Sequence, residues 1–281
     1  MSAAQSARNS DNAMASRGSL VTVREPKTWV EEMALSFPPS VVLWRTVEAQ
    51  AVRGAFSRHG VRRPILDVGC GEGVFGSIVF GKNSLDFGVE IEEPLVKAAA
   101  ASGTYLHTVL GDGTEFPFAD GYFATVFSNS VIEHIDGLDP VLAEIARVLE
   151  PMGLFVATVP SSTLADGLYF KRRLSSLGFS ALAGAYATAV NRKLHHVNLH
   201  DADAWRARLS NAGLDLIETM PYLGVRAVEA WDKLSVEYFI RRRLGISMPR
   251  HDELVRSAIS NEGSDPFGAL LLVARKSGGN S

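Results

Sequence analysis

The sequence predicts an α/β fold in which a parallel sheet is covered by helices on both faces. The composition is that of a globular chain with a substantial core, since 46% of its 281 residues are hydrophobic and 21% are charged. After Pro64, short apolar runs alternate with helical stretches over short connections, which is the pattern of strand–helix–strand units. A glycine-rich turn directly follows the first of these apolar runs, as expected where a buried strand feeds a helix.

The elements follow from apolar runs and from capping residues. Helices are expected at 73–80, 94–101, 138–149 and 201–211, the last with Asp201 as its cap and Ala212-Gly213 as its stop. Strands are expected at 64–68, 85–90, 105–110, 122–128, 153–159, 214–220 and 269–274.

The remaining stretches read as helical additions to one α/β domain. A helical pattern over 29–59 is interrupted at 37–40, where Ser40 is expected to cap the second part. The expected order along the chain is a disordered tail (1–25), an N-terminal helical lid (26–60), a cofactor-binding core (61–160), a helical insertion (161–200), a core helix and strand (201–221), a second insertion (222–262) and the last core strand (263–276).

Charge and composition exclude several classes of function. A net charge of −3 gives no reason to expect nucleic acid as a partner. No apolar run approaches the roughly 20 residues that span a bilayer, and the first 20 residues lack the apolar core of a secretory signal. The single cysteine, Cys70, excludes an intrachain disulfide, so a cytoplasmic location is expected. The oligomeric state cannot be predicted.

The glycine turn has the composition of a cofactor site. Gly69, Gly71 and Gly73 allow a left-handed turn and close approach of a ligand to the backbone. A dinucleotide fingerprint needs its third glycine one place later, where this chain has Val74. Asp67, just before the turn, would repel a pyrophosphate but suits a ligand with positive charge. S-adenosylmethionine, with an amino group and a sulfonium, is such a ligand.

Acidic residues after the next two strands fit the same ligand. Glu90 ends the second expected strand, where a carboxylate can accept hydrogen bonds from both ribose hydroxyls. Ile91 follows and could pack on the adenine face. Asp112, between two glycines after the third strand, could accept a hydrogen bond from the adenine amino group.

With these residues in place, the sequence resembles the class I S-adenosylmethionine-dependent methyltransferases, in particular the type 11 group that includes the ubiquinone/menaquinone methyltransferases. The resemblance covers roughly 64–160, with a weaker similarity at 195–220. One departure is visible: similar proteins usually have Phe-Asp in the fourth strand, where this chain has Phe123-Ala124. The matching segments, in order, are 67–73, 88–90, 111–118, 127–135 and 144–153.

The resemblance implies a Rossmann-like, doubly wound sheet of seven strands, the last of them antiparallel, with helical insertions that form a lid over the substrate. It also implies a cofactor site at the carboxyl ends of the strands. With the residues singled out above, the expected cofactor contacts are Asp67, Gly69, Cys70, Gly71, Glu90, Ile91, Asp112, Gly113 and Asn129.

Candidates for catalysis and substrate binding are less specific. His134 follows the fourth strand and could be a general base, although it could equally shape the pocket, because positioning alone can drive methyl transfer. His195 and His196 are expected near the substrate. No acid pair or cysteine pair completes a ligand set for the histidines of 195–200, so no metal site is expected. Trp29, with Trp44 and Phe37, could form the lid or pack in the core.

The expected activity is transfer of a methyl group to a small or medium, partly apolar acceptor, on oxygen first and then on carbon or nitrogen. The alternatives are a NAD-type oxidoreductase and a non-catalytic protein that binds S-adenosylmethionine. The segment 222–244 combines apolar residues with Arg241-Arg242-Arg243, which permits peripheral contact with a membrane surface, although a packed helix with a solvated end is favoured.

Overall fold

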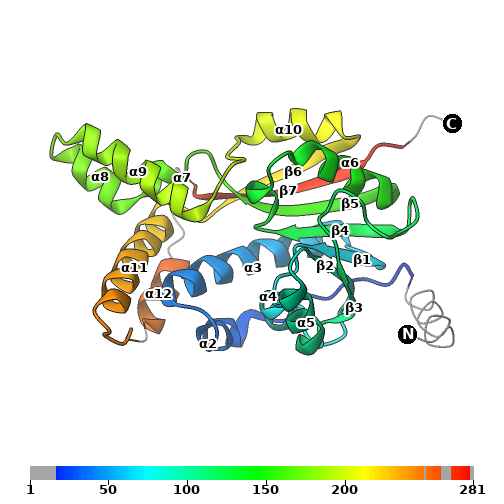
Figure 1. Ribbon diagram of the computed structural model, residues 1–281, viewed down its shortest axis with the longest axis horizontal. Coiled ribbons are helices and arrows are strands. Elements are labelled where there is room, and N and C mark those ends of the chain that lie inside the picture. The colour runs from blue at the N-terminus through cyan, green and yellow to red at the C-terminus, as the bar shows by residue number, and fades with distance from the viewer. Residues whose placement is uncertain (1–16, 250, 261–266, 279–281) are drawn as a thin grey trace.

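The computed structural model describes residues 17–249, 251–260 and 267–278. Seven strands form one sheet in the order β3-β2-β1-β4-β5-β7-β6 (Figure 1). The strands span Ile65–Val68 (β1), Leu85–Glu90 (β2), Tyr105–Leu110 (β3), Phe123–Asn129 (β4), Leu149–Pro160 (β5), Leu214–Tyr222 (β6) and Ala269–Lys276 (β7).

The sheet is parallel from β3 through β5, and β7 pairs antiparallel with both β5 and β6. The prediction of seven strands with an antiparallel last strand is therefore confirmed. All four residues of β1 are buried, as in a central strand covered on both faces. The strand order reverses direction beside β1, and ligands of doubly wound sheets bind at such a point.

Helices cover both faces of the sheet (Figure 1). One face carries α6 (Leu138–Val148) and α10 (Ala202–Asn211), which bury side chains against Leu66, Val126 and Phe155. The other face carries α3 (Pro39–His59), α4 (Val74–Val79) and α5 (Glu93–Ser102), which pack on Ile65, Phe127 and Val156. Neighbouring strand residues thus face opposite cores, as strand geometry requires.

The other helices are the short α2 (Trp29–Ala34), which precedes α3, and a separate helical lobe, and both lie beyond the carboxyl ends of the central strands. A helical lobe extends past the end of the sheet (Figure 1). One of its helices, α11 (Val225–Arg243), packs against α3 through Trp231 and Trp44, whose ring centroids lie 5.6 Å apart. The lobe consists of α7 (Leu164–Gly167), α8 (Tyr169–Ser176), α9 (Ser180–Leu194), α11 (Val225–Arg243) and α12 (Asp252–Ser260).

The predicted capping residue is confirmed for α10 and is wrong for α3. Asp201 caps α10 and accepts a 2.8 Å hydrogen bond from the Ala204 amide. Ser40 does not cap α3: the helix already starts at Pro39, and Ser40 lies buried in its first turn. Proline at the first helical position needs no amide partner and has its φ fixed at a helical value, so it sets the start of the helix.

Residues 17–25, predicted to belong to a disordered tail, pack against the protein. Of the predicted disordered segment 1–25, residues 1–16 lie outside the described part of the chain. Residues 17–25 run along the body of the protein instead: Leu20 forms a β-bridge with Arg62, and Val21 is buried in the core. The Val21 amide donates to the Val61 carbonyl at 2.8 Å. An apolar side chain at Val21 thus gives the segment a reason to pack.

Candidate functional site

The glycine turn after β1 has a positive φ at three residues, Gly69 (+75°), Gly71 (+55°) and Gly73 (+75°). A Cβ on Gly69 would lie 2.5 Å from Val131, and one on Gly73 would lie 2.6 Å from Ser102, so both glycines are required by close packing. A Cβ on Gly71 would meet nothing within 4 Å. Gly71 therefore exposes its backbone to open space, as a ligand cradle does.

That open space belongs to a first cavity of about 450 Å³ at the carboxyl ends of β1 and β4. Five of the predicted cofactor residues line it: Asp67, Gly69, Cys70, Gly71 and Asn129. The other lining residues are Phe37, Arg45, Glu72, Gly73, Val74, Phe75, Gly76, Leu95, Tyr105, Ser130 and Val131.

Asp67 has one satisfied and one unsatisfied carboxylate oxygen. Its Oδ2 accepts a 2.6 Å hydrogen bond from the Tyr105 hydroxyl, whereas Oδ1 is buried without a partner among the described residues. Burial raises the pKa of Asp67 to about 7. A buried acceptor without a donor is unfavourable, so a cationic group in the first cavity would satisfy it. This fits the amino group of S-adenosylmethionine.

Glu90 lies at the end of β2 and holds the glycine turn. Its Oε2 accepts from the Gly71 amide at 2.9 Å and its Oε1 from the Ile91 amide at 2.8 Å. Each carboxylate oxygen has a second lone pair, so both can accept a further hydrogen bond. Ile91 is 64% exposed, which leaves an apolar side chain free beside this carboxylate.

Asp112 and Gly113 follow β3, the neighbouring strand. The exposed carboxylate of Asp112 accepts hydrogen bonds from the amide and hydroxyl of Thr114, which lower its pKa. Gly113 has a φ of +87°, and a Cβ there would press on Val141 at 3.3 Å. These residues, with Glu90 and Ile91, lie at the ends of the two strands beside the first cavity rather than in its lining.

A buried carboxylate that the sequence did not reveal organises the end of β4. Glu48 on α3 is fully buried and accepts hydrogen bonds from Arg45 (2.6 Å), Ser130 (2.6 Å) and Tyr222 (3.0 Å). The Asn129 side chain donates a fourth at 3.1 Å. Burial alone would raise the pKa of Glu48, but the charge of Arg45 and these donors outweigh it, and the pKa is lowered.

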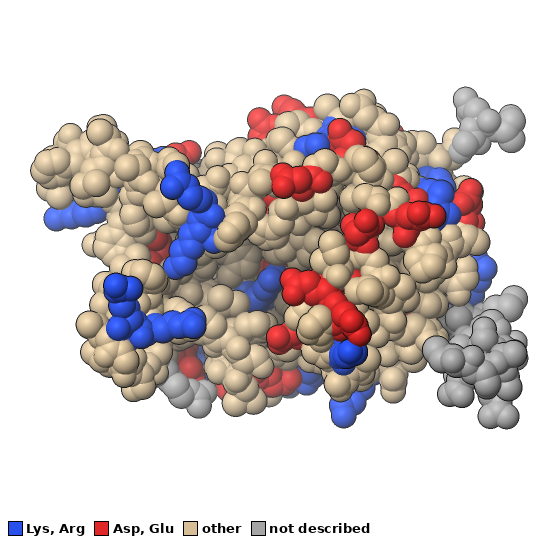
Figure 2. Space-filling model, viewed as in Figure 1, with Lys and Arg blue, Asp and Glu red and all other residues tan. Residues whose placement is uncertain are grey.

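A second cavity of about 420 Å³ adjoins the first, and Arg45 and Ser130 line both. Figure 2 shows the face of the molecule hollowed between the helical lobe and the sheet, with basic side chains on the lobe side. The second cavity is lined by Pro38, Ser40, Val41, Trp44, Arg45, Ser130, Glu133, His134, Lys193, Leu194, His196, Trp231, Ser235 and Tyr238.

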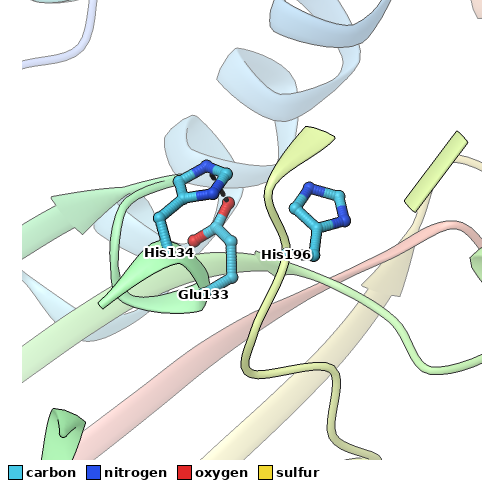
Figure 3. A group of neighbouring side chains, drawn as sticks. All are labelled: Glu133, His134 and His196. Atoms are coloured by element: carbon cyan, nitrogen blue, oxygen red, sulfur yellow. Dashed lines mark ion pairs between the residues drawn. The ribbon is translucent and has the colours of Figure 1, made fainter. Parts of the chain in front are cut away.

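Two of the predicted histidines line the second cavity and one does not. His134 and His196 lie there near each other (Figure 3), with ring centroids 5.3 Å apart. Burial and the nearby His134 lower the pKa of His196 to about 4. His195 is exposed at the end of α9. Its carbonyl accepts a hydrogen bond from His134 Nδ1 at 3.1 Å. Glu133, beside His134, is buried, and burial raises its pKa to about 8.

Trp29, a candidate for the lid over the substrate, packs in the core instead. Its side chain is fully buried in the core around α2 and α3, and it lines neither cavity. Phe37 lines the first cavity and Trp44 the second. Aromatic residues on an N-terminal helix show that some face is buried, but the sequence does not show which residue faces the core and which faces the site.

Comparisons with known proteins show a methyltransferase domain in this chain. Residues 66–157 match a family model described as a methyltransferase domain. Methyltransferase GfsG of Streptomyces halstedii is 27% identical over 162 residues, which are 55% of this chain and 53% of that protein. Sterol methyltransferase-like 2 of Botryococcus braunii is 34% identical over 153 residues, 51% of this chain and 39% of that protein. The chain thus spans about half or less of the length of these relatives.

Among solved structures, geranyl diphosphate C-methyltransferase from Streptomyces coelicolor A3(2), in complex with Mg²⁺, geranyl diphosphate and S-adenosyl-L-homocysteine, has a TM-score of 0.53. The match covers 95% of this chain and 92% of that one at 14% identity, so it shows a shared fold.

Among the helices that the structure describes, none combines the length and the apolar character that a membrane span requires. The match to the family model identifies residues 66–157 as a methyltransferase domain of the class I S-adenosylmethionine-dependent type, with S-adenosylmethionine as its cofactor.

Proposed function

We propose that this protein transfers the methyl group of S-adenosylmethionine to a small or medium, partly apolar acceptor. The proposal rests on the fact that the two cavities adjoin and share lining residues. The first holds the glycine turn and Asp67, the second holds His134 and His196, and Arg45 and Ser130 line both. A donor in one cavity and an acceptor in the other would meet at these two residues, and such positioning supplies much of the rate of a displacement reaction.

The cofactor would be held by residues at three strand ends. Its amino-acid part would lie near Asp67, Gly69 and Gly71, where the unpartnered Oδ1 and the open space at Gly71 fit it. Its ribose would bond to Glu90, and its adenine would pack on Ile91 near Asp112. When bound, the cofactor supplies an electrophilic methyl group on a sulfonium, which is already a good leaving group.

The lining of the second cavity supports an acceptor with an apolar body and a polar group. Trp44 and Trp231 meet edge to face and form an apolar wall with Leu194. Glu133 and His134 provide polar groups, which suits oxygen as the methylated atom. Two relatives are named for sterol and for geranyl diphosphate, molecules with apolar carbon skeletons, and the second is named a C-methyltransferase. Carbon is therefore the next acceptor atom to test.

His134 is the proposed group at the acceptor oxygen. Its Nδ1 is 3.1 Å from the His195 carbonyl, which can only accept a hydrogen bond, so this nitrogen carries the proton. The lone pair is then on Nε2. A lone pair beside the acceptor cavity can take a proton from a hydroxyl, although a displacement from a sulfonium does not require a strong base.

Binding and label transfer test the proposed function together. Calorimetry should show that S-adenosylmethionine and S-adenosylhomocysteine bind and that NAD does not. With methyl-tritiated S-adenosylmethionine and a panel of alkylphenols, naphthols and hydroxyquinones, label should appear in an organic-extractable product. Binding of NAD alone would refute the proposal. Tight cofactor binding without transfer to the panel or to a lipid extract would favour a non-catalytic binding protein.

Replacing Glu90 should weaken cofactor binding. We expect Glu90→Ala to bind S-adenosylhomocysteine about tenfold more weakly or worse, because hydrogen bonds to the ribose hydroxyls are lost. Glu92→Ala removes the same charge from an exposed site two residues on and should stay within about twofold of the wild type. Titration calorimetry measures both, and unchanged affinity in Glu90→Ala would mean that the ribose is held elsewhere.

Cofactor affinity should depend on pH through Asp67. Its carboxyl, with a pKa of about 7, is mostly protonated below that pH and must ionise to pair with the cofactor's ammonium. Affinity should therefore rise with pH, by at most about tenfold per unit, and level off above pH 7. Asp67→Asn should bind more weakly with a flat profile between pH 5.5 and 7. A flat wild-type profile in calorimetry would contradict the pairing.

A further inference from the structure

Three potential metal ligands converge in the second cavity. One ligand atom each from Glu133, His134 and His196 lies within 4.8 Å of the other two (Figure 3). Glu133 and His134 belong to the short helix Ile132–His134 that follows β4, whereas His196 lies in the segment after α9. The fold thus brings together residues about 60 positions apart in the sequence. The three side chains of Glu133, His134 and His196 are called the Glu133–His196 cluster below.

Backbone hydrogen bonds fix the two segments against each other. The amides of Val197 and Asn198 donate to the Glu133 carbonyl at 2.9 Å and 3.0 Å. The buried side chain of Asn198 donates to the carbonyls of Ile132 (3.1 Å) and Ile135 (2.8 Å). The cluster is therefore held by the fold on both sides, as a preorganised ligand set requires.

The hydrogen bond of His134 directs a lone pair at the carboxylate. Because Nδ1 donates to the His195 carbonyl, Nε2 carries the lone pair, and it lies 3.6 Å from Glu133 Oε1. This distance is too long for a hydrogen bond. Two lone pairs that face each other at this separation repel unless a proton or a metal cation lies between them. Metal-ligating histidines characteristically donate their other ring N–H to a carbonyl in this way.

Two further atoms of the cluster are without partners. Glu133 Oε2 and His196 Nδ1 are buried and make no hydrogen bond among the described residues. Buried polar atoms are nearly always paired in folded proteins, so these two point to an additional group. Two cationic side chains line the second cavity, Arg45 and Lys193. The guanidinium of Arg45 is bound to Glu48 at 2.6 Å, and Lys193 Nζ lies over the Phe239 ring, 5.0 Å from its centroid.

We propose that Glu133, His134 and His196 bind one divalent transition-metal ion, with zinc as the first candidate. Two imidazoles and one carboxylate are a common ligand set of zinc sites that keep an open position, whereas Mg²⁺ prefers oxygen ligands. Bonds of about 2.0–2.2 Å require the three side chains to close in slightly around the ion. In this assignment Nε2 of His134 is a metal ligand rather than a free base.

The open position would face the acceptor cavity, because all three ligands line it. This part of the inference rests on the proposed function. An oxygen of the acceptor would complete the coordination, which would favour acceptors with a hydroxyl, enol or carbonyl group. Metal binding itself needs neither cofactor nor acceptor, so it can be tested separately from methyl transfer.

Zinc binding to the full-length protein is the direct test. After dialysis against a chelator and then metal-free buffer, titration calorimetry with Zn²⁺ alone should show one equivalent bound, and millimolar Mg²⁺ should not compete. Glu133→Gln, His134→Ala and His196→Ala should each weaken Zn²⁺ binding by about tenfold or more. His200→Gln removes a nearby histidine outside the cluster and should leave the affinity unchanged.

Thermal unfolding separates loss of the site from loss of the fold. Each variant should melt cooperatively without metal, and Zn²⁺ should raise the melting temperature of the wild type and of His200→Gln but not of the cluster variants. Absence of stoichiometric Zn²⁺ binding to the wild type would overturn the proposal. Equal binding by the wild type and all three cluster variants would also overturn it, because the ion would then be held elsewhere.

Discussion

The buried carboxylate of Glu48 is the interaction on which the arrangement of the site depends. A buried charge is stable only when it is paired and hydrogen-bonded. Glu48 receives donors from α3 (Arg45), from the end of β4 (Asn129 and Ser130) and from the end of β6 (Tyr222). One carboxylate therefore joins an N-terminal helix to two strands of the sheet, and it places the two residues that line both cavities.

The glycine turn supplies the second constraint. Neighbouring side chains leave no room for a Cβ on Gly69 or Gly73, so the turn can follow β1 tightly only with glycine at these positions. Glu90 holds the turn by accepting a hydrogen bond from the Gly71 amide. The glycine turn thus lets backbone bound part of the first cavity, whereas the second is lined by residues of α3, α9 and α11 and of the segment 130–134. A backbone cradle suits a cofactor common to a large family, and a side-chain wall suits an acceptor particular to this protein.

The sheet could be predicted from the sequence, and so could five residues of the first cavity, because both depend on local order. Each central strand is a short apolar run, and Asp67 and Glu90 come at or near the ends of successive strands. The Glu48 network could not be predicted in this way, since Arg45 is near in sequence but the other three partners lie 81, 82 and 174 positions away. The same limit applies to His196: the histidines of 195–200 offered no ligand set by themselves, and Glu133 joins them only through the fold.

In the proposed complex, the cofactor's reactive end meets the acceptor at Arg45 and Ser130. A crystal structure with S-adenosylhomocysteine tests it most directly. The account predicts the ribose hydroxyls on Glu90, the amino group beside Asp67 Oδ1, and the sulfur at the opening between the two cavities. A sulfur that faces away from Arg45 and Ser130, or a ligand bound outside the first cavity, would contradict it.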